Sequence, residues 1–185
     1  MDTVIEQVLA DVKGCVSQVA TEDLLQAGTL LENSSRIFVA GAGRSGLCMR
    51  ALAMRLMHLG KTVFVLGETT TPGIVATDLL ILGSGSGQTA SLLVMTEKAR
   101  LQGAKILLFT TDSTSPLAKW ADHRVIIPAP SLKKVRNVDS FASVQPMGTL
   151  FEQVLLILSD SLILWLMERA KVSTMQMLER HFNLE

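Results

Sequence analysis

Two short apolar runs, each ending directly in a glycine-rich loop, restrict this chain to a small set of folds. The first run is Arg36–Ala40, followed by Gly41-Ala42-Gly43-Arg44-Ser45-Gly46. The second is Leu79–Leu82, followed by Gly83-Ser84-Gly85-Ser86-Gly87-Gln88-Thr89. Glycine lets a backbone turn sharply and approach a ligand closely. A helix that starts after such a loop directs free N–H groups at an anion. Each segment therefore predicts a strand, an anion-binding loop and a helix.

The rest of the chain continues this alternation of short apolar runs and amphipathic helices. Runs that are apolar throughout are typical of a parallel sheet with both faces covered. Two further helices are expected within residues 2–32. We therefore expect a three-layer αβα sandwich, doubly wound and flavodoxin-like, with a five-stranded parallel sheet and a helical N-terminal extension. The expected strands are 36–40, 62–66, 79–83, 104–109 and 124–127, and the expected later helices are 45–59, 88–101, 114–121, 148–170 and 173–180.

Length and charge limit the organisation and the partners of the chain. A chain of 185 residues can bury one full core, so we expect a single domain over 1–185. It would comprise a helical extension at 1–34, an α/β core at 35–170 and a C-terminal helix and tail at 171–185. The 17 basic and 17 acidic residues give zero net charge, which suggests neither a nucleic-acid nor a membrane partner. Asp160 interrupts the longest apolar stretch, which favours a buried helix over a membrane span.

The two cysteines, Cys15 and Cys48, show neither metal-ligand spacing nor a disulfide framework. A reducing, cytoplasmic location is the simplest interpretation, and no metal site is expected. The first residues also lack the basic start and apolar centre of a signal peptide.

The first loop also matches the G-x-G-x-x-G fingerprint of dinucleotide-binding folds, with Glu68 following the second expected strand. Three features disfavour this alternative. About 35 residues precede the first strand, whereas the fingerprint normally opens its domain. No catalytic domain is expected after the sheet, and the second loop offers hydroxyls that a dinucleotide fold does not need. We therefore expect no cofactor.

The second loop is suited to one phosphate group. Its hydroxyls would donate to the phosphate, and its backbone N–H groups would complete the cradle. The alternative is ordinary helix capping by Ser and Thr, which one hydroxyl would satisfy but three with alternating glycines exceed. The candidate hydroxyls are those of Ser84, Ser86 and Thr89, and the candidate N–H groups are those of Gly85, Gly87 and Gln88.

The two loops and the downstream segment Gln145-Pro146-Met147-Gly148-Thr149-Leu150-Phe151-Glu152-Gln153 together resemble the sugar isomerase (SIS) family, and within it the isomerases of 3-hexulose 6-phosphate. The resemblance implies a ketose–ketose isomerase of the ribulose monophosphate pathway. Such an enzyme interconverts D-arabino-3-hexulose 6-phosphate and fructose 6-phosphate through a cis-enediol, without metal or nucleotide. It also implies a homotetramer with sites near subunit boundaries. Gln88 departs from the pattern, because many SIS loops carry Glu there.

The resemblance assigns roles to residues outside the phosphate loop. Glu152 matches the family's catalytic glutamate and would move the proton between C2 and C3, a task suited to a carboxylate in a partly desolvated cleft; its alternative is to balance the dipole of the helix at 148–170. Ser45 would contact the sugar, or else cap its helix. Arg44 would reach the phosphate or a neighbouring subunit, or form a surface ion pair.

Two further candidates are less specific. His181 would shuttle a hydroxyl proton or assist ring opening from a tail that crosses into a neighbouring subunit, or be an ordinary surface histidine. Glu68 would bind sugar hydroxyls, or cap the turn that follows it. The polar loop between Pro128 and Pro146 is expected to be a lid or a partner contact. The alternatives are a non-catalytic phosphosugar-binding module, which would need neither Glu152 nor His181, and an isomerase of another sugar phosphate.

Overall fold

The computed structural model describes residues 1–130 and 143–184, so most of the loop expected to be a lid lies outside the described residues. Helices and strands alternate as the sequence predicts. The strands are β1 (Arg36–Gly41), β2 (Thr62–Val65), β3 (Leu79–Gly83), β4 (Lys105–Thr110) and β5 (His123–Ile126). The helices are α1 (Asp2–Val16), α2 (Thr21–Asn33), α3 (Gly43–His58), α4 (Ala90–Leu101), α5 (Pro116–Trp120), α6 (Thr149–Ala170) and α7 (Thr174–Leu178).

The five strands form one parallel sheet in the order β2-β1-β3-β4-β5. This order is that of flavodoxin-like folds, in which the chain reverses its direction of winding between β1 and β3. The expected fold class is confirmed. Gly41 at the end of β1 pairs in register with Gly83 at the end of β3. The two glycine loops therefore leave the sheet side by side, at the point where such folds bind ligands.

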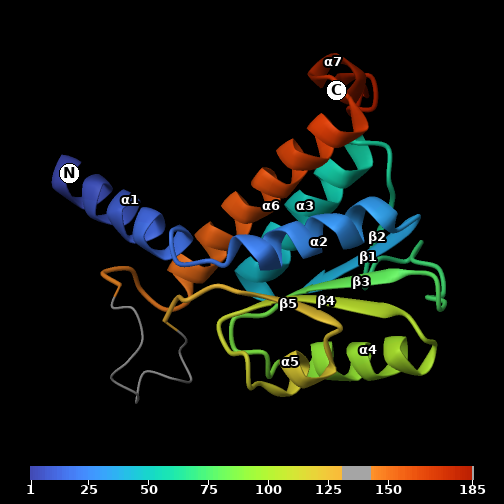
Figure 1. The fold of residues 1–185 in the computed structure, drawn as a ribbon, viewed down its shortest axis with the longest axis horizontal. Helices are drawn as coiled ribbons and strands as arrows, with labels where there is room; N and C mark the ends of the chain where they lie inside the picture. Colours follow the sequence, from blue (N-terminus) through green and yellow to red (C-terminus); the bar gives the residue numbers. More distant parts are fainter. Residues whose placement is uncertain (131–142, 185) are drawn as a thin grey trace.

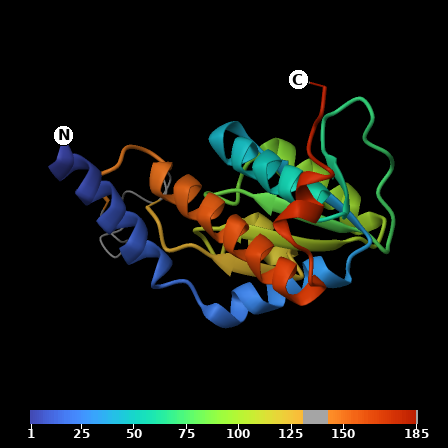
Figure 2. The ribbon, with the colours of Figure 1, turned by 90° about the horizontal axis from the view of Figure 1, so that it is seen from above.

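Helices cover both faces of the sheet. Figure 1 shows α4 and α5 below the sheet and α2, α3 and α6 above it. The first helix, α1, extends away from the body and meets it at the beginning of α6, as Figures 1 and 2 show. The last helix, α7, lies at the opposite end of α6, beside the end of α3. The helical extension predicted from the N-terminal periodicity is thus present.

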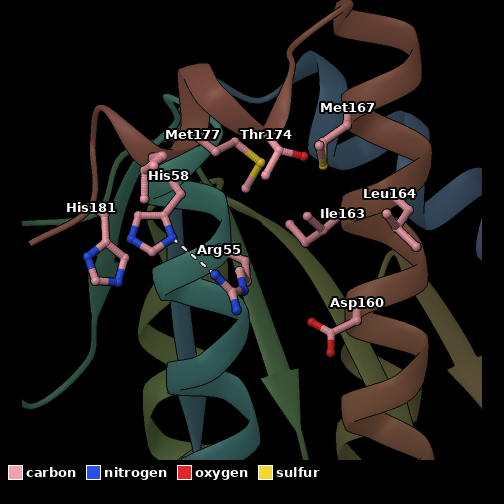
Figure 3. A pocket seen from close by; sticks show the side chains of 10 residues that line it. Arg55, His58, Asp160, Ile163, Leu164, Met167, Thr174, Met177 and His181 are labelled. Carbon is pink, nitrogen blue, oxygen red and sulfur yellow. Dashed lines mark hydrogen bonds between the residues drawn. The ribbon is translucent and has the colours of Figure 1, made fainter.

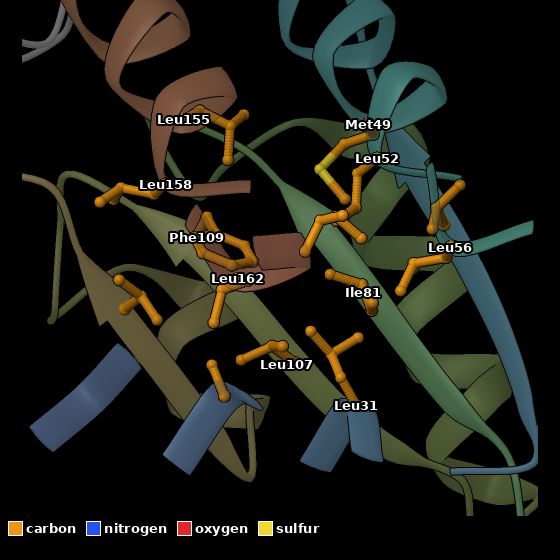
Figure 4. Packing of buried hydrophobic residues seen from close by; sticks show 14 of the residues in the cluster. Leu31, Met49, Leu52, Leu56, Ile81, Leu107, Phe109, Leu155, Leu158 and Leu162 are labelled. Carbon is orange, nitrogen blue, oxygen red and sulfur yellow. The ribbon is translucent and has the colours of Figure 1, made fainter. Parts of the chain in front are cut away.

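The larger part of the core lies between the sheet and the α2, α3 and α6 layer. Side chains from β3 and β4 there meet residues of α3 and α6, and Figure 4 shows Ile81, Phe109 and Leu155 among them. Gly28 of α2 lets the Trp165 ring pack closely, because a Cβ at Gly28 would lie 2.7 Å from that ring. Removing apolar surface from water stabilises this layer by about 25 cal/mol per Å².

Helix α6 is apolar and long enough to cross a membrane by length and composition, but half of it is buried in the protein. Its buried face contributes Phe151, Leu155 and Leu162 to the core beneath α3. Leu156, Ile157 and Leu164 on the same helix stay exposed. α6 is therefore a core helix whose outer face is apolar.

Candidate functional site

Three helices begin at the carboxyl edge of the sheet and direct their N-termini at one pocket. These are α3, α4 and α6, and their cap residues are Ala42, Thr89 and Gly148. None of the three caps makes a side-chain hydrogen bond to its helix. Each helix N-terminus carries roughly half a positive charge. Together, the three make the pocket attractive to an anion.

The pocket has a volume of about 200 Å³, below the roughly 300–1,000 Å³ of pockets that hold drug-sized ligands. A small anionic ligand suits this size. Residues from both glycine loops, from the end of β4 and from the start of α6 line it: Ala42, Ser45, Gly83, Ser84, Gly85, Ser86, Thr89, Thr111, Pro130, Met147, Gly148, Phe151 and Glu152.

The first loop needs its glycines for packing and conformation. A Cβ on Gly41 would lie 2.9 Å from the backbone of Gly46, and a Cβ on Gly46 would lie 2.6 Å from the Gly41 carbonyl oxygen. Gly43 has a φ of 57°, which is costly for residues with a side chain. The start of α3 therefore lies directly against the end of β1, and this places Ser45 in the pocket.

The second loop presents donors that the protein leaves unused. Among the described residues, nothing accepts a hydrogen bond from the N–H groups of Gly85, Ser86 or Thr89, nor from the first three N–H groups of α4. Buried or half-buried N–H groups are seldom left unpaired. A bound anion would supply their acceptor.

The hydroxyls expected to hold phosphate lie together. Ser84 Oγ and Thr89 Oγ1 are 3.4 Å apart, and Ser86 Oγ accepts from the Gln88 N–H at 3.3 Å. Thr89 caps α4 with its backbone only, and Ser45 lies inside α3 rather than at its cap. Capping of α3 and α4 therefore does not explain these hydroxyls.

Glu152 brings a carboxylate to the same pocket from the first turn of α6. Its side chain is 16% exposed, and Arg44 Nε lies 2.9 Å from its Oε2. The Glu152 carbonyl also accepts a bond from Cys48 Sγ at 3.3 Å. Burial raises the pKa of the Cys48 thiol, and the negative charge of Glu152 raises it further against the opposing effect of Arg44. Cys48 is thus a neutral neighbour of the carboxylate.

Two expected phosphate ligands occupy supporting positions. Gly87 has a φ of 59° and is buried beneath the loop. A Cβ there would collide with Ser115 Oγ. Gln88 is exposed and does not line the pocket. Both residues belong to the loop, but neither lines the pocket.

Glu68 and His181 do not line the pocket. Glu68 follows β2 and pairs with Arg50 at 2.7 Å in solvent. His181 lies past the far end of α3, where its ring stacks on His58 with 5.3 Å between centroids. Because α3 has 16 residues, its two ends lie about 24 Å apart. A role for His181 at a pocket of this kind therefore requires the pocket of another subunit.

A second pocket, of about 410 Å³, lies at the far end of α3 and α6. Figure 3 shows Arg55 and His58 on α3 facing Asp160, Ile163 and Met167 on α6. Arg55 Nη1 lies 3.5 Å from His58 Nδ1. Burial lowers the His58 pKa, and the charges of Arg55 and His181 lower it further. A largely neutral His58 can accept from Arg55.

Thr111 and Pro130 line the pocket but lie in none of the three motifs, and Ala42, Gly83, Met147, Gly148 and Phe151 line it from within the motifs without having been expected as site residues. Thr111 follows β4, the neighbour of β3, so the rule that carboxyl ends of parallel strands share an edge could have found it. Met147 has a positive φ of 57°, which sequence does not reveal for a residue with a side chain. Asp11 of α1 accepts bonds from Ser143 Oγ and the Val144 N–H, so the N-terminal helix holds the segment that leads to Met147.

Residues 30–157 match the model of the SIS domain family. The chain belongs to the SIS domain family. The match includes all three motifs that resembled it, so that interpretation is confirmed. Among the described residues, no group of three or more His, Cys, Asp or Glu side chains is placed to hold a metal ion.

Two curated relatives match nearly the full chain. A 3-hexulose-6-phosphate isomerase of Mycobacterium gastri is 43% identical over 175 residues, which are 95% of this chain and 86% of the relative. A 3-hexulose-6-phosphate isomerase of Bacillus subtilis is 38% identical over 181 residues, which are 98% and 97% of the two chains.

Solved structures extend the likeness to three dimensions. A Methanococcus jannaschii protein, for which a function as 3-hexulose-6-phosphate isomerase was inferred, is 31% identical. It superposes with a TM-score of 0.84 over 99% of both chains. A putative sugar-phosphate isomerase from Listeria monocytogenes has a TM-score of 0.79 at 20% identity, over 96% of this SIS domain protein and 94% of the other chain. This second likeness supports the fold alone.

Proposed function

We propose that this SIS domain protein is a 3-hexulose-6-phosphate isomerase, an intramolecular oxidoreductase that interconverts D-arabino-3-hexulose 6-phosphate and fructose 6-phosphate. One observation carries the proposal. A pocket surrounded by three helix N-termini also contains a largely buried carboxylate, that of Glu152. The first feature suits a phosphate dianion and the second suits proton transfer. The relatives of the same name support the choice of sugar.

The phosphate binds in the second loop in this proposal. Ser84, Ser86 and Thr89 donate from their hydroxyls, and the unpaired N–H groups of the loop and of α4 donate from the backbone. These donors are neutral and fixed by the fold. They offset the loss of water around the dianion without a charged side chain.

Glu152 acts as the base. It removes the proton from C2 of the 3-ketose, the electrons of that C–H bond form the C2=C3 double bond, and the C3 carbonyl oxygen takes up a proton from water to give a cis-enediol. Glu152 then returns its proton to C3, the O2–H proton is released to water, and the carbonyl is left at C2. One carboxylate serves both carbons because they are adjacent. No metal or nucleotide takes part in this proposal.

Arg44 and Ser45 both come from the first turn of α3, and of the two only Ser45 lines the pocket. The ion pair with Arg44 holds the Glu152 carboxylate in one orientation, which favours a near-attack geometry. Ser45 lines the pocket between the phosphate loop and Glu152 and would bind a sugar hydroxyl.

We also propose that the chain is a single SIS unit over 1–185 that works as a cytoplasmic homotetramer. Exposed apolar side chains lie on α1, α3 and α6, and they include Ile5, Leu9, Leu47, Met54 and Leu164. Contiguous apolar surface of this kind would mark a contact between subunits. In an assembly of this kind, His181 of one subunit would reach the pocket of another. Both thiols are free, as a reducing compartment requires.

The test is an isomerase assay with 3-hexulose 6-phosphate beside arabinose 5-phosphate and sedoheptulose 7-phosphate. The proposal predicts turnover of the hexulose phosphate at a kcat/KM well above those for the other two. Binding of fructose 6-phosphate without exchange of its C3 proton with solvent would instead favour the non-catalytic phosphosugar-binding module. Light scattering of the eluting protein measures the assembly, for which a mass of four chains is expected.

A further inference from the structure

One carbonyl of the phosphate loop has an unusual number of donors. The Gly85 carbonyl oxygen accepts from Thr110 Oγ1 at 3.1 Å, from Thr111 Oγ1 at 2.9 Å and from the Thr111 N–H at 3.0 Å. These donors come from the last residue of β4, Thr110, and from the residue that follows it. A carbonyl oxygen has two lone pairs, so this group is fully engaged.

The direction of that carbonyl fixes the direction of an amide. The Gly85 carbonyl and the Ser86 N–H belong to the same peptide unit, and the described residues contain no cis peptide bond. In a trans peptide the C=O and the N–H point to opposite sides. The threonines therefore turn the Ser86 N–H away from β4. That N–H lies in a pocket-lining residue, and none of the described residues accepts from it.

Neighbouring contacts hold the loop in the same orientation. The Gly87 carbonyl accepts from the Leu117 N–H at 3.1 Å, and the Ser84 carbonyl accepts from the Gly87 N–H at 3.1 Å. From the other side, the Phe151 ring lies over Gly85, where a Cβ would come within 3.2 Å of it. The loop is thus fixed between α6 and the 110–117 segment, with the carbonyls of Ser84, Gly85 and Gly87 engaged by the protein.

The geometry points to Thr110 and Thr111 as positioning residues of the phosphate site: by clamping the Gly85 carbonyl, they aim the Ser86 N–H at the phosphate of the substrate. This inference rests on the proposed function and adds two residues that would act on the ligand through the backbone. A pre-aimed donor loses no energy in reorientation when the anion arrives. Without the clamp, the peptide can rotate and present its carbonyl oxygen to the phosphate.

Four variants of the full chain test the clamp. Thr111→Val and Thr110→Val each remove one donor without changing side-chain shape much, and Thr111→Ser keeps the hydroxyl. Thr96→Val is the matched control, because Thr96 is buried and its Oγ1 donates to the Leu92 carbonyl within α4. The measurements are KM and kcat for fructose 6-phosphate and titration with inorganic phosphate.

Each valine variant at 110 or 111 should weaken phosphate binding and raise KM by about three- to tenfold, the loss expected for one hydrogen bond. The kcat should change by less than about twofold, because Glu152 is untouched. Thr111→Ser should restore both values, and Thr96→Val should leave them unchanged. A variant that folds poorly would also lose kcat. If removing any buried threonine hydroxyl were enough to cause this, Thr96→Val would lose kcat too.

Thr110 separates the clamp from direct contact, because it is buried and does not line the pocket. An effect of Thr111→Val without an effect of Thr110→Val would mean direct contact with the phosphate and would overturn the positioning role. The positioning role would also be overturned if neither valine variant changed phosphate binding or KM. Phosphate titration needs no turnover, so a protein that binds phosphate in this pattern but isomerises nothing would refute the proposed function and leave the clamp standing.

A measurement on the unaltered protein guards against variants that fail to fold. The amide proton of Ser86 should move to lower field in NMR spectra when inorganic phosphate is added, because it gains a charged acceptor. An unchanged Ser86 amide, with phosphate bound elsewhere in the loop, would contradict the inference.

Discussion

The two ends of the α3 and α6 pair carry pockets of opposite construction. At the N-terminal ends, glycine loops and unpaired N–H groups surround about 200 Å³. At the C-terminal ends, Arg55, His58 and His181 surround about 410 Å³. The larger pocket contains the arginine and the two histidines, and the helix dipoles there present their negative ends. Arg55 at that end balances the helix dipoles, whereas the smaller pocket presents unpaired backbone N–H groups that suit an anion.

If the proposed function holds, neither pocket size nor side-chain charge locates the anion site in this fold. What matters is where the carboxyl ends of β1 and β3 meet and which helices begin there. The carboxylate of Glu152 is tolerated among three helix N-termini because they favour negative charge. The same environment would hold a phosphate beside it.

The largest expected effect is the loss of catalysis in Glu152→Gln. The change keeps the size of the side chain but removes the base, so kcat should fall by about 10²- to 10⁴-fold. Binding of fructose 6-phosphate, measured by calorimetry, should persist. Glu168→Gln, at the C-terminal end of the same helix, is the control and should keep full turnover. Equal activity of the two variants would exclude Glu152 as the base.

Glycine substitutions in the two loops should differ in stability. Gly87→Ala introduces a Cβ at a φ of 59°, in collision with Ser115 Oγ. Gly43→Ala has a similar φ of 57° but open space around it. We expect a loss of about 1–2 kcal/mol for Gly43→Ala from conformation alone, and a larger loss for Gly87→Ala. Urea unfolding of both variants measures this, and equal losses would show that the loop yields without strain.

A smaller effect is expected on the pH dependence of stability, through His58 in the larger pocket. The His58 pKa is lowered by burial first and then by Arg55 and His181; the pocket also holds Asp160, whose negative charge opposes them. A histidine with a lowered pKa in the folded state stabilises the protein above its unfolded pKa of about 6.5, and this stability is lost as pH falls below that value. His58→Gln should flatten the decline in unfolding free energy between about pH 7 and pH 5. An unaltered slope would place the acid sensitivity elsewhere.

Much of the fold and part of the site could be predicted from the sequence, for physical reasons. Buried parallel strands are apolar throughout, and their carboxyl ends share one edge, so Gly41 and Gly83 could be placed together. The same rule places the hydroxyls of Ser84, Ser86 and Thr89 at this edge, because their loop directly follows β3.

The remaining features depend on side-chain packing between distant segments. The ion pair of Arg44 with Glu152 joins α3 to α6, and the position of His181 depends on how α7 packs beside α3. The roles of Thr110 and Thr111 depend on the direction of one peptide unit. No local pattern in the sequence encodes these contacts.

The proposed site is tested most directly by a crystal structure of Glu152→Gln with fructose 6-phosphate bound. The phosphate should lie in the loop Ser84–Thr89, within hydrogen-bond distance of the Ser86 N–H, with C2 and C3 of the sugar facing the side chain of residue 152. A phosphate lodged between Arg55, His58 and His181, with the glycine loops empty, would contradict it.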